Sequence, residues 1–152
     1  MSKKQAKGSD DTFGRPLSAV ELRQLYNGRT WLWENGGGYM DPSGRFGAII
    51  DSWNGRMSMA DGEWTANDRG RLCFRGSWRS QTGKTHSESC FTHYAWGDVI
   101  YQRKEPNGSW YVFKHSPTAE SDEFNMIVPG NRIAVPISSK RPAQASGRRK
   151  RK

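Results

Sequence analysis

Short runs rich in aromatic and β-branched residues follow one another between residues 29 and 115, and glycine-ending turns separate them. Gly stands last and mostly Asp, Asn or Ser first in Asp41–Gly44, Ser52–Gly55, Asn67–Gly70, Ser80–Gly83 and Glu105–Gly108, with one more possible turn at residues 94–97. Runs of this length between turns are typical of strands joined as hairpins. We therefore predict a mainly β fold, an antiparallel meander of about seven or eight strands that closes as a small β-barrel or sandwich because long open edges invite aggregation.

One short N-terminal helix precedes the strands. Ser18 fits an N-cap, Glu21 three positions later completes a capping box, and Leu17 against Leu22 forms a hydrophobic staple. Gly28 supplies the left-handed residue that often follows a helix. The pattern predicts a helix that begins after Ser18 and ends just before Gly28.

The pattern loosens beyond residue 117. Residues 119–128 fit a helical turn that is capped by Ser121 and packed through Phe124. Arg132–Ile137 reads as a last strand, and Pro136 places it at the edge of a sheet because proline cannot donate to a central ladder.

The 152 residues carry a net charge of +9, which by itself would favour a nucleic-acid-binding protein. Residues 1–15 hold four basic and two acidic side chains, and residues 140–152 hold seven basic and no acidic ones, so the stretch between them is neutral. Both ends are too polar to bury apolar surface. We expect a flexible N-terminal arm over residues 1–15, a single β-rich domain over 16–139 and a disordered basic C-terminal tail over 140–152.

Cys73 and Cys90 are the two cysteines of the chain. Pairing across the turn at 80–83 places Cys73 directly opposite Cys90, and the same register places Arg75 opposite Glu88. Opposed cysteines on neighbouring strands are close enough for a disulfide. We therefore predict a Cys73–Cys90 bridge and an oxidising compartment.

Two alternatives to the bridge remain. Both thiols could be reduced and buried in a cytosolic protein. A zinc site that adds His86 and His93 conflicts with strand geometry, because residues three apart face opposite sides and His86 lies about 13 Å along the strand from Cys90. We expect no metal and no other cofactor.

The sequence lacks the familiar catalytic motifs: the Gly-x-Ser-x-Gly elbow, the phosphate loop and His-Glu-x-x-His. Gly36–Gly38 has no helix signal after it and reads as a bend between strands. His86, His93 and His115 fall in three different runs, and each reads as a surface or strand-pairing residue. The sequence leans against an enzyme, although a catalytic site without a known motif stays open.

The turn at 105–108 predicts a candidate ligand surface. Pairing across it places Arg103 opposite Trp110 and puts Tyr101 on the same face, while Ile100 and Phe113 face the other side. If Ile100 and Phe113 belong to the core, then Tyr101, Arg103 and Trp110 form an exposed cationic and aromatic surface. Such a surface suits a sugar ring, an anionic group or a protein partner.

Several motifs follow one another in the order of a known bacterial family: Gly28–Trp33, Gly36–Tyr39, Gly62–Trp64, Arg69–Phe74, Cys90–His93, Ile100–Lys104 and Gly108–His115. Over about residues 17–137 the chain resembles domain of unknown function 995 (DUF995), whose members are typically small proteins with a cleavable export signal. The resemblance implies a periplasmic or secreted β-rich protein with its two cysteines bridged. It brings no activity and no catalytic residue.

The function predicted first is a non-catalytic exported protein, periplasmic or secreted, that binds a small ligand, a glycan or a partner protein. No run reaches the roughly 18 apolar residues of a membrane span, and residues 1–5 lack the apolar segment of a secretory signal, so we expect any export signal to have been removed or never present. The alternative is a secreted or host-directed protein, and the alternative location is the cytoplasm or, if the tail is a nuclear-import signal, the host nucleus. In that case a basic tail would bind an anionic polymer such as nucleic acid or act as a targeting signal, through Lys140, Arg141, Arg148, Arg149, Lys150, Arg151 and Lys152.

Overall fold

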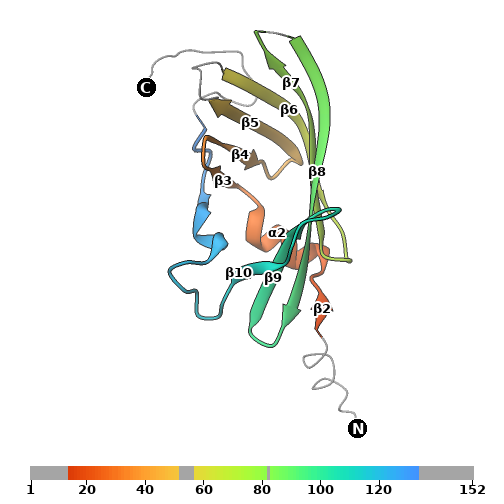
Figure 1. Ribbon diagram of the computed structural model, residues 1–152, viewed down its shortest axis with the longest axis vertical. Coiled ribbons are helices and arrows are strands. Elements are labelled where there is room, and N and C mark those ends of the chain that lie inside the picture. Colours follow the sequence, from red (N-terminus) through yellow and green to blue (C-terminus); the bar gives the residue numbers. More distant parts are fainter. Residues whose placement is uncertain (1–13, 52–56, 82, 134–152) are drawn as a thin grey trace. The chain divides into compact units, whose positions relative to one another are not determined.

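The computed structural model describes residues 14–51, 57–81 and 83–133 (Figure 1). The chain is mainly β, as predicted, with one α-helix, α2 (Ala19–Tyr26), and one 3₁₀ turn, η1 (Glu123–Met126). The strands are β2 (Arg15–Pro16), β3 (Arg29–Trp33), β4 (Gly36–Met40), β5 (Arg45–Asp51), β6 (Met57–Ala66), β7 (Arg71–Ser80), β8 (Gly83–Trp96), β9 (Val99–Lys104), β10 (Tyr111–Lys114) and β11 (Ile127–Pro129).

The strands follow the order of a meander, β10-β9-β8-β7-β6-β5-β4-β3-β11, and β2 pairs with β8 (Figure 1). From β3 to β10 every strand is hydrogen-bonded to its neighbour in sequence, which confirms the predicted antiparallel hairpins. The described residues form two compact units: unit 1 is 14–25, 65–73 and 89–125, and unit 2 is 26–51, 57–64, 74–81, 83–88 and 126–133. The outer boundaries predicted at residues 15 and 139 stay predictions.

Helix α2 begins as predicted. The Ser18 hydroxyl accepts a hydrogen bond from the Glu21 amide at 3.1 Å, and the Glu21 carboxylate accepts one from the Ser18 amide at 2.9 Å. Arg15 adds an ion pair of 2.8 Å to Glu21, and this hydrogen-bonded partner is the main reason that the pKa of Glu21 is lowered to about 2. Gly28 follows the helix with φ of 71°, as the C-terminal pattern predicts.

The core of unit 1 combines apolar and polar side chains. Leu17, Leu22, Leu72 and Phe113 are fully or almost fully buried, and the side chains of His93 and Gln102 are fully buried among the residues of the same unit. Buried polar groups require hydrogen-bond partners, so this core is held in a specific geometry as well as by apolar contact.

The core of unit 2 is built around aromatic rings. Phe74 stacks on Phe46 with ring centroids 4.6 Å apart and on Trp33 at 6.0 Å, and it meets Trp31 edge to face at 6.4 Å. Aromatic pairs in these arrangements add stability beyond the area that they bury. Trp31, Trp33, Phe46 and Phe74 therefore have a structural explanation in this core.

The glycine run of β4 corrects one expectation. Gly36–Gly38 lies inside a strand that pairs with β3 on one side and β5 on the other, and it is not a bend between strands. A Cβ atom at Gly38 would lie 2.9 Å from the rings of both Phe46 and Trp33. Gly38 makes room for the aromatic core, and Gly36 for the backbone of Ile49, from which a Cβ atom would lie 1.9 Å; the local sequence reveals neither contact.

The last strand also differs from expectation. A single turn, η1, lies within the predicted 119–128 segment, but the strand that follows is β11, about five residues earlier than Arg132–Ile137. Ile127 is buried and pairs with Trp31 of β3. Only residues 132 and 133 of the predicted strand lie among the described residues, and neither is in a strand.

Candidate ligand-binding surface

The part of β8 that belongs to unit 1, together with β9 and β10, places alternate side chains on two faces. Tyr101 pairs with Tyr94 of β8 and with Val112 of β10, while Thr92 pairs with Arg103. Because side chains alternate along a strand, all of these residues share one face. Gln102 and His93, which also pair, share the opposite, buried face.

The first face carries a group of residues that we call the aromatic–arginine strip: Tyr94, Tyr101, Arg103 and Trp110. The guanidinium of Arg103 lies over the Trp110 ring, 5.4 Å from its centroid, and the Tyr94 ring meets the Trp110 ring edge to face at 5.7 Å. Trp110 is 47% exposed, and the other three residues are partly exposed. The predicted candidates Tyr101, Arg103 and Trp110 therefore lie on one accessible face.

The predicted register holds at Tyr111 and Val112 but shifts by one residue beyond them. Lys114, rather than Phe113, pairs with Ile100, because the strand has an irregularity between Val112 and Lys114. Phe113 is nevertheless fully buried, as expected, and Ile100 is half-buried.

Arg103 is held by neutral groups. Its Nη1 donates to the carbonyl of Pro106 at 3.3 Å, and its Nε is buried without a hydrogen-bond partner among the described residues. The ring of Trp110 supports the guanidinium plane. A guanidinium stacked on an aromatic ring keeps its charge and loses little further freedom on binding.

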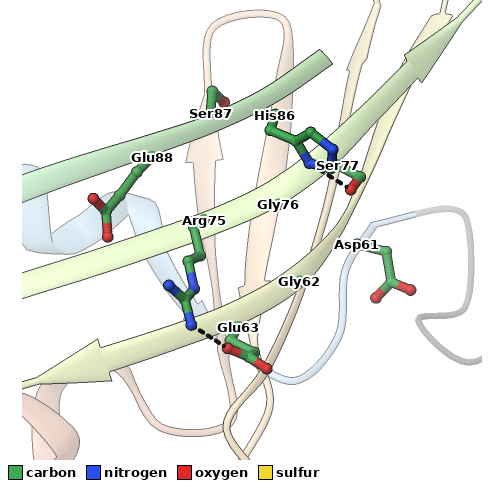
Figure 2. A pocket seen from close by; sticks show the side chains of 9 residues that line it. All are labelled: Asp61, Gly62, Glu63, Arg75, Gly76, Ser77, His86, Ser87 and Glu88. Carbon is green, nitrogen blue, oxygen red and sulfur yellow. Dashed lines mark hydrogen bonds and ion pairs between the residues drawn. The ribbon is translucent and has the colours of Figure 1, made fainter. Parts of the chain in front are cut away.

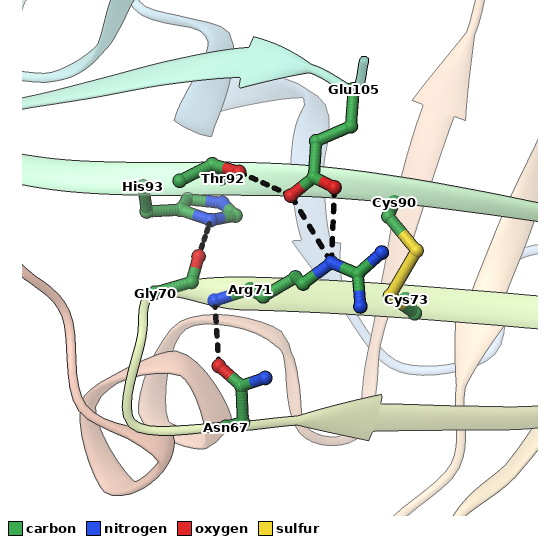
Figure 3. The surroundings of a disulfide bond; sticks show 8 residues. All are labelled: Asn67, Gly70, Arg71, Cys73, Cys90, Thr92, His93 and Glu105. Atoms are coloured by element: carbon green, nitrogen blue, oxygen red, sulfur yellow. Dashed lines mark hydrogen bonds and ion pairs between the residues drawn. A yellow bond between two sulfur atoms is a disulfide. The ribbon is translucent and has the colours of Figure 1, made fainter.

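The carboxylate of Glu105 stands near the strip but has other partners (Figure 3). It accepts hydrogen bonds from the Thr92 hydroxyl and from Arg71 Nε, the latter at 3.0 and 3.2 Å. The hydrogen bond from Thr92 is the main cause that lowers the pKa of Glu105; partial burial opposes it, and the charges of Arg71 and Arg103 act in the same direction as Thr92. Glu105 therefore forms an ion pair with Arg71 and acts on Arg103 only through its charge.

A chain of polar groups crosses the buried face. The Gly70 carbonyl lies 2.9 Å from His93 Nδ1, His93 Nε2 lies 2.9 Å from Gln102 Nε2, and the Tyr111 hydroxyl donates to Gln102 Oε1. A carbonyl only accepts, so Nδ1 of His93 carries the proton. Nε2 then accepts from the Gln102 amide group, which leaves Oε1 for Tyr111.

Both titratable members of this chain are kept neutral. Burial lowers the pKa of His93 to about 4, against the opposing effect of backbone carbonyls at Gly70 and Phe91. Burial of the hydroxyl, with the nearby charge of Glu123, raises the pKa of Tyr111 to about 12. A neutral imidazole without solvent access positions strands and does not transfer protons to a ligand.

The turn before β7 is shaped by this contact. Gly70 has φ of 76°, and its carbonyl accepts from both the amide and the imidazole of His93. A Cβ atom at Gly70 would lie 2.2 Å from the carbonyl oxygen of His93. Glycine is required here by both its conformation and the close approach of β8.

Cys73 and Cys90 form the predicted disulfide in unit 1 (Figure 3). Both cysteines are buried. The bond excludes the reduced alternative in this structure, and it also excludes the zinc alternative because the sulfurs are bonded to each other. In unit 2 the Ser77 hydroxyl lies 2.9 Å from His86 Nδ1, which obeys the same predicted register.

A second histidine of unit 1 is held by a carboxylate. His115 Nδ1 lies 2.7 Å from Asp122 Oδ1, and Oδ2 accepts from the amides of His115 and Ala119. Burial works to raise the pKa of Asp122, but these hydrogen bonds outweigh it and hold the pKa below the usual value. Asp122 thus closes the loop from residue 115 to 122. In the described part of the chain no Ser, Cys or Lys side chain is seen hydrogen-bonded to the imidazole of His115, although Lys114 Nζ donates to its backbone carbonyl at 3.4 Å.

Unit 2 has an open groove of about 480 Å³ on β6, β7 and β8 (Figure 2). Arg75 pairs with Glu63 at 3.0 Å and not with Glu88 as expected, while Asp61 pairs with Arg45 at 2.7 Å. These ion pairs join mostly exposed groups, so they contribute little to stability. The groove is a solvated strand surface whose charges largely compensate one another.

A family model described as "Protein of unknown function (DUF995)" matches residues 1–133. The chain belongs to this family. No curated protein and no solved structure matches it. Family membership confirms the resemblance found in the sequence, and it assigns no activity to any residue of this DUF995 protein.

Tyr94 is the member of the strip that the sequence reading missed. The expected turn at 94–97 would have placed Tyr94 inside a turn, whereas the observed pair Trp96–Val99 places the turn at Gly97 and Asp98. Gly-Asp between two aromatic runs is itself a hairpin signal. Reading it as such would have paired Tyr94 with Tyr101.

Two further expectations for this DUF995 protein have different outcomes. The structure contains no helix, within residues 14–51, 57–81 and 83–133, that could cross a membrane. The basic-tail residues lie outside the described part of the chain, so their predicted role in binding an anionic polymer or in targeting stays a prediction: Lys140, Arg141, Arg148, Arg149, Lys150, Arg151 and Lys152.

Proposed function

We propose that this protein is an exported, non-catalytic carbohydrate-binding protein and that the aromatic–arginine strip is its binding surface. The observation that carries the proposal is the contact of Arg103 with a half-exposed Trp110, beside Tyr94 and Tyr101 on the same strand face. Large aromatic side chains left in water on a folded surface usually mark a binding site.

A sugar is the ligand that suits this surface best. The strip is a strand face with partly exposed rings, and a pyranose ring has flat C–H faces that can lie on indole and phenol rings. Tyrosine and tryptophan also supply a large contact area with little loss of conformational freedom, and their polar atoms hydrogen-bond to hydroxyl groups. These properties favour a glycan over the small ligand or the partner protein that the sequence also allowed.

The surroundings of the strip favour binding without catalysis. Hydrolysis of glycosides ordinarily requires two carboxyl groups on either side of the scissile bond. Beside the strip, Glu105 is engaged by Thr92 and Arg71. The nearest histidine on the neighbouring strand, His93, is buried on the opposite face.

The disulfide supports the exported part of the proposal, because such bonds persist mainly in oxidising compartments. The test is the intact mass of protein taken from its native cell, measured before and after denaturing reduction and thiol labelling. We expect Cys73 and Cys90 to be blocked from labelling until reduction. Free thiols in freshly isolated protein would contradict export.

The binding proposal is tested with an immobilised panel of neutral, uronate-containing and sulfated oligosaccharides. We expect the full chain to bind members of the panel and Trp110→Ala to weaken that binding at least about tenfold, as for an aromatic hot spot. Trp78→Ala, which removes a partly exposed tryptophan of unit 2, is the matched control and should bind like the unmodified protein. Absence of binding to every member of the panel would contradict the proposal.

A further inference from the structure

We propose that the ligand of the aromatic–arginine strip is an anionic glycan, and that Arg103 binds its carboxylate or sulfate group. This inference rests on the proposed function and adds the chemical class of the ligand. It is carried by the charge and the contacts of Arg103, which binding of a neutral sugar would not require.

The positive charge of Arg103 is the first reason to expect an anionic ligand. Among the described residues its side chain makes no ion pair, although Arg71 pairs with Glu105 at 3.0 Å. Glu105 is already engaged by Thr92 and by Arg71, so it forms no hydrogen bond with the guanidinium of Arg103. This part of unit 1 therefore keeps one positive charge in excess, on the residue that lies over the exposed tryptophan.

The guanidinium of Arg103 is also held in place before a ligand binds. Nη1 donates to the Pro106 carbonyl, and Trp110 supports the plane of the group. Neither contact neutralises the charge, yet both restrict the side chain. A planar guanidinium binds carboxylate or sulfate oxygens through two parallel hydrogen bonds. Because this side chain is already restricted, it loses little conformational entropy on binding.

The spacing between Tyr101 and Arg103 suits one charged sugar ring. Tyr101 and Arg103 are two positions apart on β9 and therefore about 7 Å apart along the strand. That distance fits a single sugar ring resting on aromatic side chains while its carboxylate or sulfate reaches the arginine. A neutral sugar would leave the charge of Arg103 without a counterpart.

The experiment compares Arg103→Gln with Lys104→Gln as a matched control. Lys104 is the next residue of β9; it is exposed, and it points to the opposite face, so both variants remove one positive charge from the same strand. Oligogalacturonate and its methyl ester, sulfated oligosaccharides, neutral oligosaccharides and a single-stranded oligonucleotide are titrated against the unmodified protein and each full-length variant. The ester differs from the acid in charge, and the sulfated compounds distinguish the two anionic groups.

We expect the unmodified protein to bind uronate-containing or sulfated members of the panel at least about tenfold more tightly than their neutral counterparts. Arg103→Gln should remove this preference, Lys104→Gln should keep it, and higher salt should weaken binding of the anionic members only. Thermal unfolding of both variants is measured alongside, so that a loss of folded protein is recognised.

Three outcomes would overturn the inference. Equal binding of acid and ester would leave carbohydrate binding intact and remove the anionic class. An equal loss of both ligands in Arg103→Gln would show that Arg103 only supports Trp110. Tighter binding of a single-stranded oligonucleotide than of any glycan would show that the ligand is a nucleic acid and not a glycan. Separately from these three outcomes, a panel in which no glycan binds would contradict the proposed function itself.

Discussion

Two polar side chains, His93 and Gln102, are fully buried in the core of unit 1, whereas the core of unit 2 is arranged around the ring of Phe74. In unit 1 the Gly70 carbonyl, His93, Gln102 and Tyr111 form a hydrogen-bonded chain that runs from a backbone carbonyl to a phenol. In unit 2, Phe46 and the tryptophans of β3 contact Phe74 through their rings. The polar chain of unit 1 depends on hydrogen-bond direction and protonation state, and the ring cluster of unit 2 depends on shape.

The difference matters for the proposed binding surface. Gln102 faces the polar chain, and its neighbours Tyr101 and Arg103 face the strip. Hydrogen bonds are directional, so they fix the register of β9 more precisely than apolar contact does. We infer that the buried polar chain holds the strip in position, while the aromatic core of unit 2 supplies stability that pH does not affect.

The largest effect is expected from Phe74→Ala in unit 2. This variant removes a buried ring that contacts three other aromatic rings. Loss of apolar burial together with the cavity left behind should lower the free energy of unfolding by about 3–5 kcal/mol. Urea unfolding followed by tryptophan fluorescence measures the change.

Phe74→Leu is the control for this prediction, because it keeps much of the volume and loses the ring contacts. It should lose clearly less stability than Phe74→Ala. If the two variants lost the same small amount, below about 1 kcal/mol, the ring cluster would not be the centre of the unit 2 core.

The disulfide should have the next largest effect. The paired residues of unit 1 are 17 positions apart. For a loop of this length, loop-closure entropy corresponds to about 3 kcal/mol of stabilisation. The Cys73→Ala, Cys90→Ala double variant should lose roughly that amount in urea unfolding, and added reductant should then have no further effect on it. A double variant as stable as the bridged protein would contradict this prediction.

The hairpin that carries this bridge could be predicted from the sequence, and its chemistry explains why. The Ser80–Gly83 turn fixes a register that brings Cys73 opposite Cys90, and the Ser77–His86 contact obeys the same register. Local turn chemistry and strand alternation are enough for such pairs. The same reasoning placed Tyr101, Arg103 and Trp110 on one face.

Other features could not be read from local signals. The burial of His93 depends on β7, β9 and β10, which approach it from distant parts of the sequence. Gly38 of β4 is explained by the rings of Phe46 and Trp33, and Gly36 by the backbone of Ile49, which lies on the neighbouring strand β5. Asp122, which holds His115, lies in a loop whose path is decided by tertiary contacts. Periodicity predicts which face a side chain takes, but not what packs against that face.

The polar chain of unit 1 predicts a dependence of stability on pH. His93 has a pKa of about 4 in the folded protein, below the ordinary value of 6.5 that we expect in the unfolded chain. The contribution of His93 to the free energy of unfolding is therefore complete above pH 6.5. It falls as the pH drops, because His93 binds a proton in the unfolded chain but stays neutral in the folded one. The loss is about 1.4 kcal/mol per pH unit, or about 2 kcal/mol between pH 6.5 and 5.

The measurement is the free energy of unfolding at several pH values for the unmodified protein and for His93→Gln. The difference between the two curves isolates His93. Four carboxylates with a lowered pKa also contribute to the free energy of unfolding, but they lose these contributions at a more acidic pH than the range from 6.5 to 5. They are Glu21, Asp41, Glu105 and Asp122. A difference that stays constant from pH 6.5 to 5 would contradict a buried, neutral His93.

The smallest effect is expected at the groove of unit 2. Arg75 and Glu63 form an ion pair of 3.0 Å, but their side chains are 65% and 57% exposed. Water and salt screen such a pair, and fixing two long side chains costs entropy, so Arg75→Gln should change the free energy of unfolding by less than about 0.5 kcal/mol. The same substitution should leave glycan binding unchanged, in contrast to Arg103→Gln, whose guanidinium is stacked on a tryptophan and has no carboxylate of its own. If Arg75→Gln weakened binding as much as Arg103→Gln does, the binding surface would lie in unit 2, and the division between a unit that binds and a unit that stabilises would be wrong.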